Sequence, residues 1–227
     1  MNTKRNNGNE QQPYIPAGHG KESGQYTNKV YVDNNYDDFI IKEGCTQSEL
    51  EALLTESEYN AIKEYTNPVI GCALNKANRE DNLTIDQAIM TRLILNGISR
   101  HNLKDGVEVY RGITVTNEVF IKDFYNKYVN HETINGSRIC STSRKLQRAI
   151  ESAKTNKENC IGIIFVGILP KGYNALPVEK IAYNPQEKEI IIAKPVYKIK
   201  SIETGYLNNK MVKIIRVELK GANQHEH

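Results

Sequence analysis

The hydrophobic period of this chain changes from that of helices to that of strands near residue 107. Ahead of that point, three segments place a threonine three positions before a Glu or Gln, at 46–49, 55–58 and 84–87. This is the capping-box pattern, in which both side chains bond free amides at the start of a helix. From Val107 onward, apolar residues recur at every second position, the period of a half-buried strand. Helices followed by strands predict an α+β fold rather than a doubly wound parallel sheet.

The N-terminal half predicts a lobe of four helices. Pro68 separates the second helix from the third, and Asn96-Gly97 is predicted to end the fourth, since glycine commonly follows a helix C-terminus. Each helix has an apolar stripe that we expect to form the core of the lobe. The stripes contain Leu50, Leu53 and Leu54, then Tyr59, Ile62 and Tyr65, then Ile70 and Leu74, and finally Ile85, Ile89 and Leu93.

The C-terminal half predicts strands and one further helix. Residues 161–168 form a nearly continuous apolar run, which is typical of a strand covered on both faces. A short strand is predicted at 139–143, and a closing hairpin at 196–202 and 212–219 around a loop at 207–210. The further helix follows the short strand and carries Leu146, Ala149, Ile150 and Ala153.

The amino-acid composition indicates which part of the chain is folded. The hydrophobic fraction of the 227 residues is 39%, which suggests that part of the chain is not packed. Residues 1–29 contain almost no aliphatic side chains, so burial there cannot offset the entropy lost on ordering. We expect a flexible polar tail at 1–40, one domain at 41–220 and a second tail at 221–227. Alternating apolar and acidic residues within 30–41 favour an added edge element.

Composition also argues against several classes of site and partner. The net charge is +3 without a dense run of Lys or Arg, so nothing indicates a nucleic-acid surface. Four cysteines lie far apart, a spacing that favours neither a zinc site nor a disulfide framework. The sequence has no apolar run of membrane-spanning length and no signal-peptide core. We therefore expect no metal, no membrane partner and no nucleic acid.

A polar, proline-containing turn at 183–189 delivers two carboxylates to the start of the apolar segment 190–192. Side chains at i and i+2 of a strand point to the same face, about 6–7 Å apart. Glu187 and Glu189 are therefore predicted to face one pocket, with Lys188 pointing away. Two carboxylates so placed can divide the work of cleaving a glycosidic bond. The alternative is an exposed Glu-Lys-Glu strand end.

Arg111 shares a predicted strand face with Val107, Val109 and Ile113, where an aliphatic residue is expected. A half-buried guanidinium needs an anionic partner, because an unpaired buried charge is costly. That partner is either an internal carboxylate or the phosphate or ribose of a ligand, which the arginine fork fits well.

In chain order, Arg111, Ser141-Thr142-Ser143 and Glu187-Lys188-Glu189 form a pattern that resembles the arginine–serine–glutamate class of mono-ADP-ribosyltransferases. The resemblance covers about residues 45–204. Residues 61–66, Leu74-Asn75 and Arg79 are similar to the helical signature of that family. Residues 109–112 match its first strand, and 170–190 resemble the corresponding stretch of actin-modifying binary toxins and vegetative insecticidal toxins.

This resemblance implies a helical lobe packed on two small perpendicular mixed β-sheets, with NAD as co-substrate in the cleft and no metal. Arg111 would contact the NAD phosphates or ribose, and the Gly112 backbone would hold the nicotinamide carboxamide. Ser141 would orient Glu189, which would bond the ribose 2′-hydroxyl and stabilise the oxocarbenium. The implied NAD-contacting set is Tyr110, Arg111, Gly112, Ser141, Thr142 and Ser143.

Glu187 and Tyr183 would meet the acceptor, which we predict to be an arginine of a protein. A guanidinium is protonated at physiological pH and becomes nucleophilic only when a carboxylate takes its proton. Relatives that modify asparagine carry Gln at the position of Glu187. Here the nearest glutamine is Gln186, one position early and on the other predicted face.

One feature of the toxin relatives is absent. They carry a Phe and a second Arg after Ser-Thr-Ser, for nicotinamide stacking and phosphate binding. Residues 144–160 contain no aromatic side chain and no Phe-x-x-Arg. Arg144, Arg148 or Lys154 could supply the charge.

We expect a monomeric toxin or phage-carried effector that acts in the cytoplasm of a target cell. Two alternatives stay open. One is an NAD glycohydrolase on the same fold, with water as the acceptor. The other is a non-catalytic phage-head-associated protein whose cleft has decayed.

Overall fold

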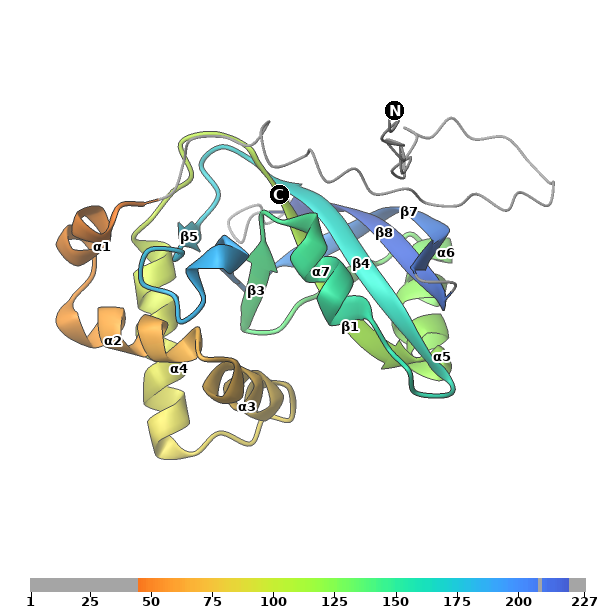
Figure 1. Cartoon of the computed structure of the whole chain (residues 1–227), viewed down its shortest axis with the longest axis horizontal. Helices are drawn as coiled ribbons and strands as arrows, with labels where there is room; N and C mark the ends of the chain where they lie inside the picture. Colours follow the sequence, from red (N-terminus) through yellow and green to blue (C-terminus); the bar gives the residue numbers. More distant parts are fainter. Residues whose placement is uncertain (1–44, 208–209, 221–227) are drawn as a thin grey trace, which may run out of the picture.

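The computed structural model describes residues 45–207 and 210–220 of the chain (Figure 1). The predicted tails at 1–40 and 221–227, the edge element at 30–41 and the centre of the loop at 207–210 lie outside the described residues. The predicted limits of the domain therefore stay a prediction.

Four helices form a lobe at one end of the molecule (Figure 1): α1 (Gln47–Leu53), α2 (Glu56–Tyr65), α3 (Pro68–Arg79) and α4 (Ile85–Ser99). The three predicted capping boxes are present at Thr46, Thr55 and Thr84. Pro68 is the first residue of α3, where its missing N–H would have had no helical partner anyway.

The predicted stripe of α4 is wrong at Ile85 and Ile89, whereas Leu93 packs against the core of the lobe. Ile85 is 80% exposed and Ile89 is 45% exposed, whereas the buried face of the helix contains Ile94 and Ile98. Gly97 does not end the helix but lies buried inside it, and a Cβ there would come within 2.6 Å of Ile62 Cδ1. The close approach of α4 to α2 at Gly97 determines which face of α4 is buried. The spacing of the isoleucines alone does not identify that face.

Eight strands form one mixed sheet in the order β2-β7-β8-β4-β1-β3-β6-β5. Strands β4 and β8 pair in parallel, and the other neighbours pair antiparallel. The α+β fold is confirmed, as are the short strand and the closing hairpin. The strands are β1 (Val107–Thr116), β2 (Thr133–Asn135), β3 (Ile139–Ser143), β4 (Cys160–Leu169), β5 (Ala175–Pro177), β6 (Glu189–Ala193), β7 (Val196–Leu207) and β8 (Lys210–Lys220).

The resemblance implied two perpendicular sheets, whereas the strands here form one continuous sheet that is narrowest between β1 and β3. Strands β1 and β4 pair along their whole length, from Val107 opposite Leu169 to Thr116 opposite Cys160. Strands β1 and β3, by contrast, share the single register pair Tyr110–Ser143. Beyond that pair the strands part, so the next residues of β1 have no ladder partner on β3. This parting leaves space for a site.

Helix α7 (Leu146–Ala153) lies across β1 and β4 beside that point (Figure 1). It packs closely because two glycines face its backbone. A Cβ on Gly112 would lie 1.8 Å from the Ala149 carbonyl oxygen, and one on Gly162 would lie 2.1 Å from that of Ala153. No other residue type allows this approach, so the two glycines determine how closely α7 packs on the sheet.

A further helical segment packs beside β7: α5 (Asn117–Phe120), the π-helical turn η2 (Ile121–Tyr125) and α6 (Asn126–Val129). The short 3₁₀ turn η3 (Pro185–Glu187) precedes β6. The main core contains Phe120, Phe124 and the sheet residues Ile163, Phe165 and Ile215. A second core joins the helical lobe to β6 through Ile62, Ile94 and Ile191.

Candidate active site

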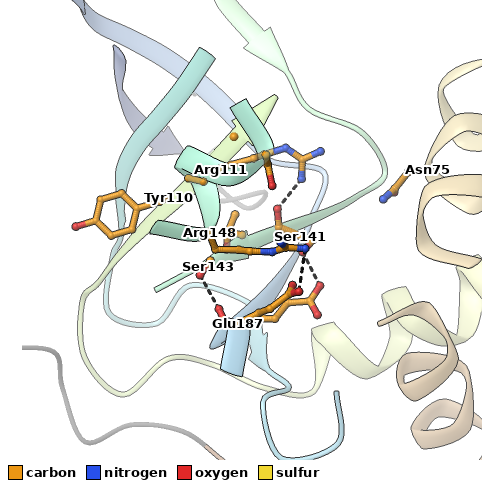
Figure 2. Close-up of a pocket in the computed structure, with 12 residues that line it drawn as sticks. Asn75, Tyr110, Arg111, Ser141, Ser143, Arg148 and Glu187 are labelled. Atoms are coloured by element: carbon orange, nitrogen blue, oxygen red, sulfur yellow. Dashed lines mark hydrogen bonds and ion pairs between the residues drawn. The ribbon is translucent and has the colours of Figure 1, made fainter. Parts of the chain in front are cut away.

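A pocket of about 190 Å³ opens where β1 and β3 part, next to α7 and the start of β6 (Figure 2). The predicted catalytic and NAD-contacting residues all line it, and Tyr183 does not. The lining residues are Asn75, Tyr110, Arg111, Gly112, Ser141, Thr142, Ser143, Arg148, Ala149, Ser152, Glu187 and Glu189.

Glu189 is the first residue of β6 and is 7% exposed. It pairs with Ser143 in the β3–β6 ladder, and the Ser141 hydroxyl donates a hydrogen bond of 2.5 Å to its Oε1. Burial raises the pKa of the Glu189 carboxyl to about 7; the bond from Ser141 lowers it and the nearby charge of Glu187 raises it further. The carboxyl therefore titrates near neutral pH.

Arg111 enters the pocket from β1, and its Nη1 donates a hydrogen bond of 2.6 Å to the Ser141 carbonyl oxygen. Within the described residues 45–207 and 210–220, no carboxylate forms an ion pair with it. The structure thus gives no support to the internal salt bridge considered as an alternative for this residue. A guanidinium with remaining donors faces the pocket.

The predicted placement of Glu187 on a strand is wrong. Glu187 ends the 3₁₀ turn η3, and the ladder with β3 begins only at Glu189 because β3 ends opposite it at Ser143. Lys188 between them adopts the left-handed conformation (φ 50°, ψ 46°). The Ser143 hydroxyl also donates to the Glu187 carbonyl oxygen at 2.6 Å. The two carboxylates still meet in one pocket, through a turn rather than through strand alternation.

Arg148 brings a second guanidinium to the pocket (Figure 2). Its Nη2 lies 2.8 Å from Glu187 Oε1, and its Nη1 lies 3.3 Å from Glu151 Oε2. The Asn184 amide donates to the same Glu187 oxygen at 2.9 Å. Of the three basic residues that follow Ser-Thr-Ser, Arg148 lines the pocket, Arg144 is buried against Glu179, and Lys154 lines a separate cavity.

The pocket wall formed by α7 carries small side chains, Ala149 and Ser152, and not the aromatic ring that the resemblance led us to expect after Ser-Thr-Ser. Among the described residues that line the pocket, Tyr110 is the one aromatic. Its side chain packs in the cluster with Ile150 and Ile164, and its hydroxyl donates to Glu108. Figure 2 shows its ring directed away from Glu187. A stacking partner for nicotinamide is therefore not supplied by this wall.

A second cavity, of about 650 Å³, adjoins the first and shares Arg111 with it. Basic side chains at its wall are Arg79, Arg111 and Lys127, and aromatic ones are Phe124, Phe165 and Tyr197. The Phe165 ring lies 5.7 Å from that of Phe124 and 5.8 Å from that of Tyr197. Cations beside rings suit a phosphorylated aromatic ligand.

Sequence reasoning missed most of this second cavity. Arg79 was singled out only as part of a helical signature, as was Asn75 of the first pocket. The three aromatic residues come from elements far apart in the chain, and each alone is typical of a hydrophobic core. Tyr183 is 70% exposed, and its backbone N–H donates to the Thr66 hydroxyl at 2.8 Å. It sits on the loop that leads to Glu187.

The family model of ADP-ribosyltransferase exoenzymes matches residues 44–220, a range that includes the Arg, Ser-Thr-Ser and both glutamates of this pocket. The chain belongs to the ADP-ribosyltransferase exoenzyme family. The resemblance stated from the sequence is thereby confirmed, and the family supports an NAD-dependent ADP-ribosyltransferase of the toxin type. A search of curated protein sequences found no match.

Solved structures of ADP-ribosylating toxins share the fold. Plx2a from Paenibacillus larvae is 21% identical, with a TM-score of 0.63 over 77% of this chain and 90% of that one. BECa of a C. perfringens binary enterotoxin, solved with NADH, is 18% identical, with a TM-score of 0.59 over 76% of this chain and 45% of that one. C3stau2 from S. aureus, solved with NAD, is 16% identical, with a TM-score of 0.55 over 79% and 98%.

Two kinds of feature are absent from the described residues. Residues 45–207 and 210–220 contain no group of three or more His, Cys, Asp or Glu side chains that could hold a metal ion. In the same part of the chain, no helix is both long enough and apolar enough to cross a membrane.

Proposed function

We propose that this family member transfers ADP-ribose from NAD to an arginine side chain of a protein acceptor and releases nicotinamide. The observation that carries the proposal is the ion pair between Arg148 and Glu187, beside the buried Glu189. Glu187 already binds a guanidinium in the pocket where the glycosidic bond would be cleaved. An acceptor arginine needs the same contact.

The two cavities suit the two ends of NAD. We assign the nicotinamide ribose to the smaller pocket, next to Glu189 and Gly112, with Tyr110, Thr142 and Ser143 completing its wall. The diphosphate would lie at Arg111, which both cavities share. The adenosine would enter the larger cavity, where Arg79 and Lys127 add positive charge and the aromatic side chains offer contact area.

Glu189 is the residue we propose to act on the ribose. Cleavage of the bond to nicotinamide leaves positive charge on the ribose, and the leaving group departs neutral with the bonding electrons. A fixed carboxylate in a buried site stabilises that charge more than water does. Ser141 holds the carboxylate in place through its hydrogen bond. Glu189 must be ionised for this role.

Glu187 is the residue we propose to act on the acceptor. A new bond forms between the guanidinium nitrogen and the ribose carbon, and the guanidinium gives one proton to the Glu187 carboxylate. Tyr183, exposed on the same loop, would contact the acceptor protein. As a member of a toxin family, the chain is proposed to act on a protein inside a target cell.

The test uses labelled NAD in a cell lysate, with the modified residue mapped by mass spectrometry and nicotinamide release measured in parallel. We expect label on arginine, and none with Glu189→Gln. Nicotinamide release without any labelled arginine would favour the glycohydrolase alternative. Neither outcome, together with no detectable binding of NAD, would favour the non-catalytic one.

A further inference from the structure

A group of charged side chains lies beneath the loop that carries Glu187. Arg144 follows β3 directly, and Glu179 lies two residues after β5. Their side chains are 6% and 8% exposed, and Arg144 Nη2 forms an ion pair with Glu179 Oε2. The Lys188 Nζ lies 3.9 Å from Glu179 Oε1. We call Arg144, Glu179 and Lys188 the loop cluster.

The loop cluster connects both ends of the segment 178–188. At the far end, the Arg144 backbone N–H donates to the Lys188 carbonyl oxygen at 3.2 Å. At the near end, Val178 N–H donates to the Glu189 carbonyl oxygen at 3.0 Å, and Glu179 is the next residue. Arg144 thus holds one end through its backbone and the other through its side chain.

A buried ion pair such as Arg144–Glu179 contributes little to the free energy of folding. Desolvation offsets most of their attraction, and apolar side chains of similar size often do as well. Lys188 is also held at a positive φ, a conformation that non-glycine residues seldom adopt. Because this buried pair lies next to the active site and holds a turn with an unfavourable backbone conformation, we infer that it fixes the position of the turn.

The two glutamates differ in how firmly their backbones are held. Glu189 lies in β6, with β3 on one side and Val178 on the other. Glu187 ends a three-residue turn, and its carbonyl oxygen accepts a hydrogen bond from the Ser143 hydroxyl. The next residue, Lys188, is held by the Arg144 backbone N–H and by Glu179. Loss of the loop cluster will therefore displace Glu187 more than Glu189.

We propose that Arg144 and Glu179 are positioning residues for Glu187, which set how much of the cleaved ADP-ribose goes to arginine and how much to water. This inference rests on the proposed function for its activity readout. Glycosidic cleavage needs Glu189, which stays in place without the loop cluster. Capture by a guanidinium needs the Glu187 carboxylate in the correct position. A displacement of about 1 Å lowers the rate of such a step about 100-fold.

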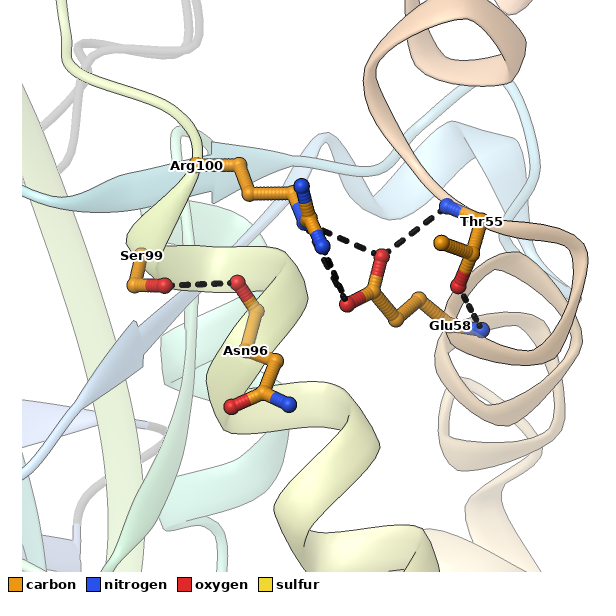
Figure 3. Close-up of polar contacts among 5 residues, drawn as sticks. All are labelled: Thr55, Glu58, Asn96, Ser99 and Arg100. Carbon is orange, nitrogen blue, oxygen red and sulfur yellow. Dashed lines mark hydrogen bonds and ion pairs between the residues drawn. The ribbon is translucent and has the colours of Figure 1, made fainter.

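The test compares Glu179→Gln with a matched control in the helical lobe. Glu58 is also a buried carboxylate paired with an arginine: its Oε2 lies 3.1 Å from Arg100 Nε (Figure 3). Neither residue lines the pocket. Glu179→Gln is expected to lower the ratio of arginine modification to NAD hydrolysis at least about tenfold. Glu58→Gln is expected to lower the melting temperature and leave the ratio unchanged. An unchanged ratio in folded Glu179→Gln would overturn the proposal.

A double variant separates an effect on the position of Glu187 from an effect on the stability of the protein. Arg144→Leu combined with Glu179→Leu removes both buried charges, so it is expected to melt higher than Glu179→Gln. If the loop cluster acts on geometry, the ratio stays low in this variant despite the recovered stability. A ratio that recovers together with the melting temperature would mean that the pair is only structural, and would refute a positioning role.

Hydrogen exchange of residues 178–189 keeps the test independent of the acceptor. Faster exchange in Glu179→Gln than in Glu58→Gln supports the proposal, and equal exchange contradicts it. A wild-type enzyme that hydrolyses NAD but modifies no arginine would reject the proposed function, and this measurement would still decide the role of the loop cluster.

Discussion

The Ser141 hydroxyl donates a hydrogen bond of 2.5 Å to Glu189 Oε1 across the β3–β6 pair. It opposes the effect of burial, which raises the pKa of Glu189 to about 7. The two side chains come from strands 48 residues apart in sequence. Their contact couples the ionisation of the proposed catalytic carboxylate to one neighbouring hydroxyl.

The first prediction concerns pH. If ionised Glu189 is the active form, kcat/KM for NAD should rise through about pH 7, because this parameter follows groups in the free enzyme. Ser141→Ala removes a bond that favours the ionised form, so the midpoint should move to higher pH. Ser143→Ala is the control, since its hydroxyl bonds the Glu187 carbonyl oxygen instead. A flat profile between about pH 6 and 8 would exclude Glu189 from the rate-determining ionisation.

The second prediction concerns stability in Glu189→Gln. The folded-state pKa of Glu189 is raised above its usual 4.5, so its ionisation weakens the fold progressively as pH rises from about 4.5 to about 7. The glutamine side chain does not ionise, so the variant should not lose stability in this way. At about pH 8 it should be more stable than wild type by about 2–3 kcal/mol. Near about pH 4 the two should be similar. Denaturant unfolding at both pH values measures the difference, and equal stability at the higher pH would contradict the raised pKa.

The same variant should lose transfer and NAD hydrolysis together, each by at least about 100-fold, while NAD still binds. The carboxylate acts on the charge of the transition state more than on bound NAD. Nicotinamide release and calorimetric NAD binding test this. A loss of less than about tenfold would remove Glu189 from the proposed role.

A third prediction separates the two glutamates. Glu187→Gln should lower arginine modification by about 100-fold and keep NAD hydrolysis, because an amide cannot take a proton from a guanidinium whereas water needs less help. Both rates are measured in one assay with labelled NAD. An equal loss of both activities would show that the glutamates act together on NAD, and the arginine assignment would lose its main support.

The fourth prediction concerns Arg111. Arg111→Lys should weaken NAD binding about tenfold, since a lysine cannot present two parallel donors to a phosphate. Thermal stability without NAD should change little, because no carboxylate among the described residues forms an ion pair with this side chain. Normal NAD binding combined with early melting would instead indicate a structural role.

The sequence by itself determined the features that depend on neighbours in the chain. Each capping box joins residues three apart, so Thr46, Thr55 and Thr84 start their helices wherever the lobe packs. The strand at 139–143 and the order of Arg111, Ser-Thr-Ser and Glu189 were readable in the same way. These residues identified the family, and the structure brings them into one pocket.

Tertiary structure decided what depends on distant contacts. The inward face of α4 follows from the approach of Gly97 to Ile62, and Glu187 leaves the strand because β3 ends at Ser143. Arg144 and Arg148 are indistinguishable by spacing, yet one is buried against Glu179 and the other reaches the pocket. Periodicity reports which side of an element is apolar. It carries no information on which partner that side meets or where the partner's ladder ends, because those are set by packing between segments far apart in the chain.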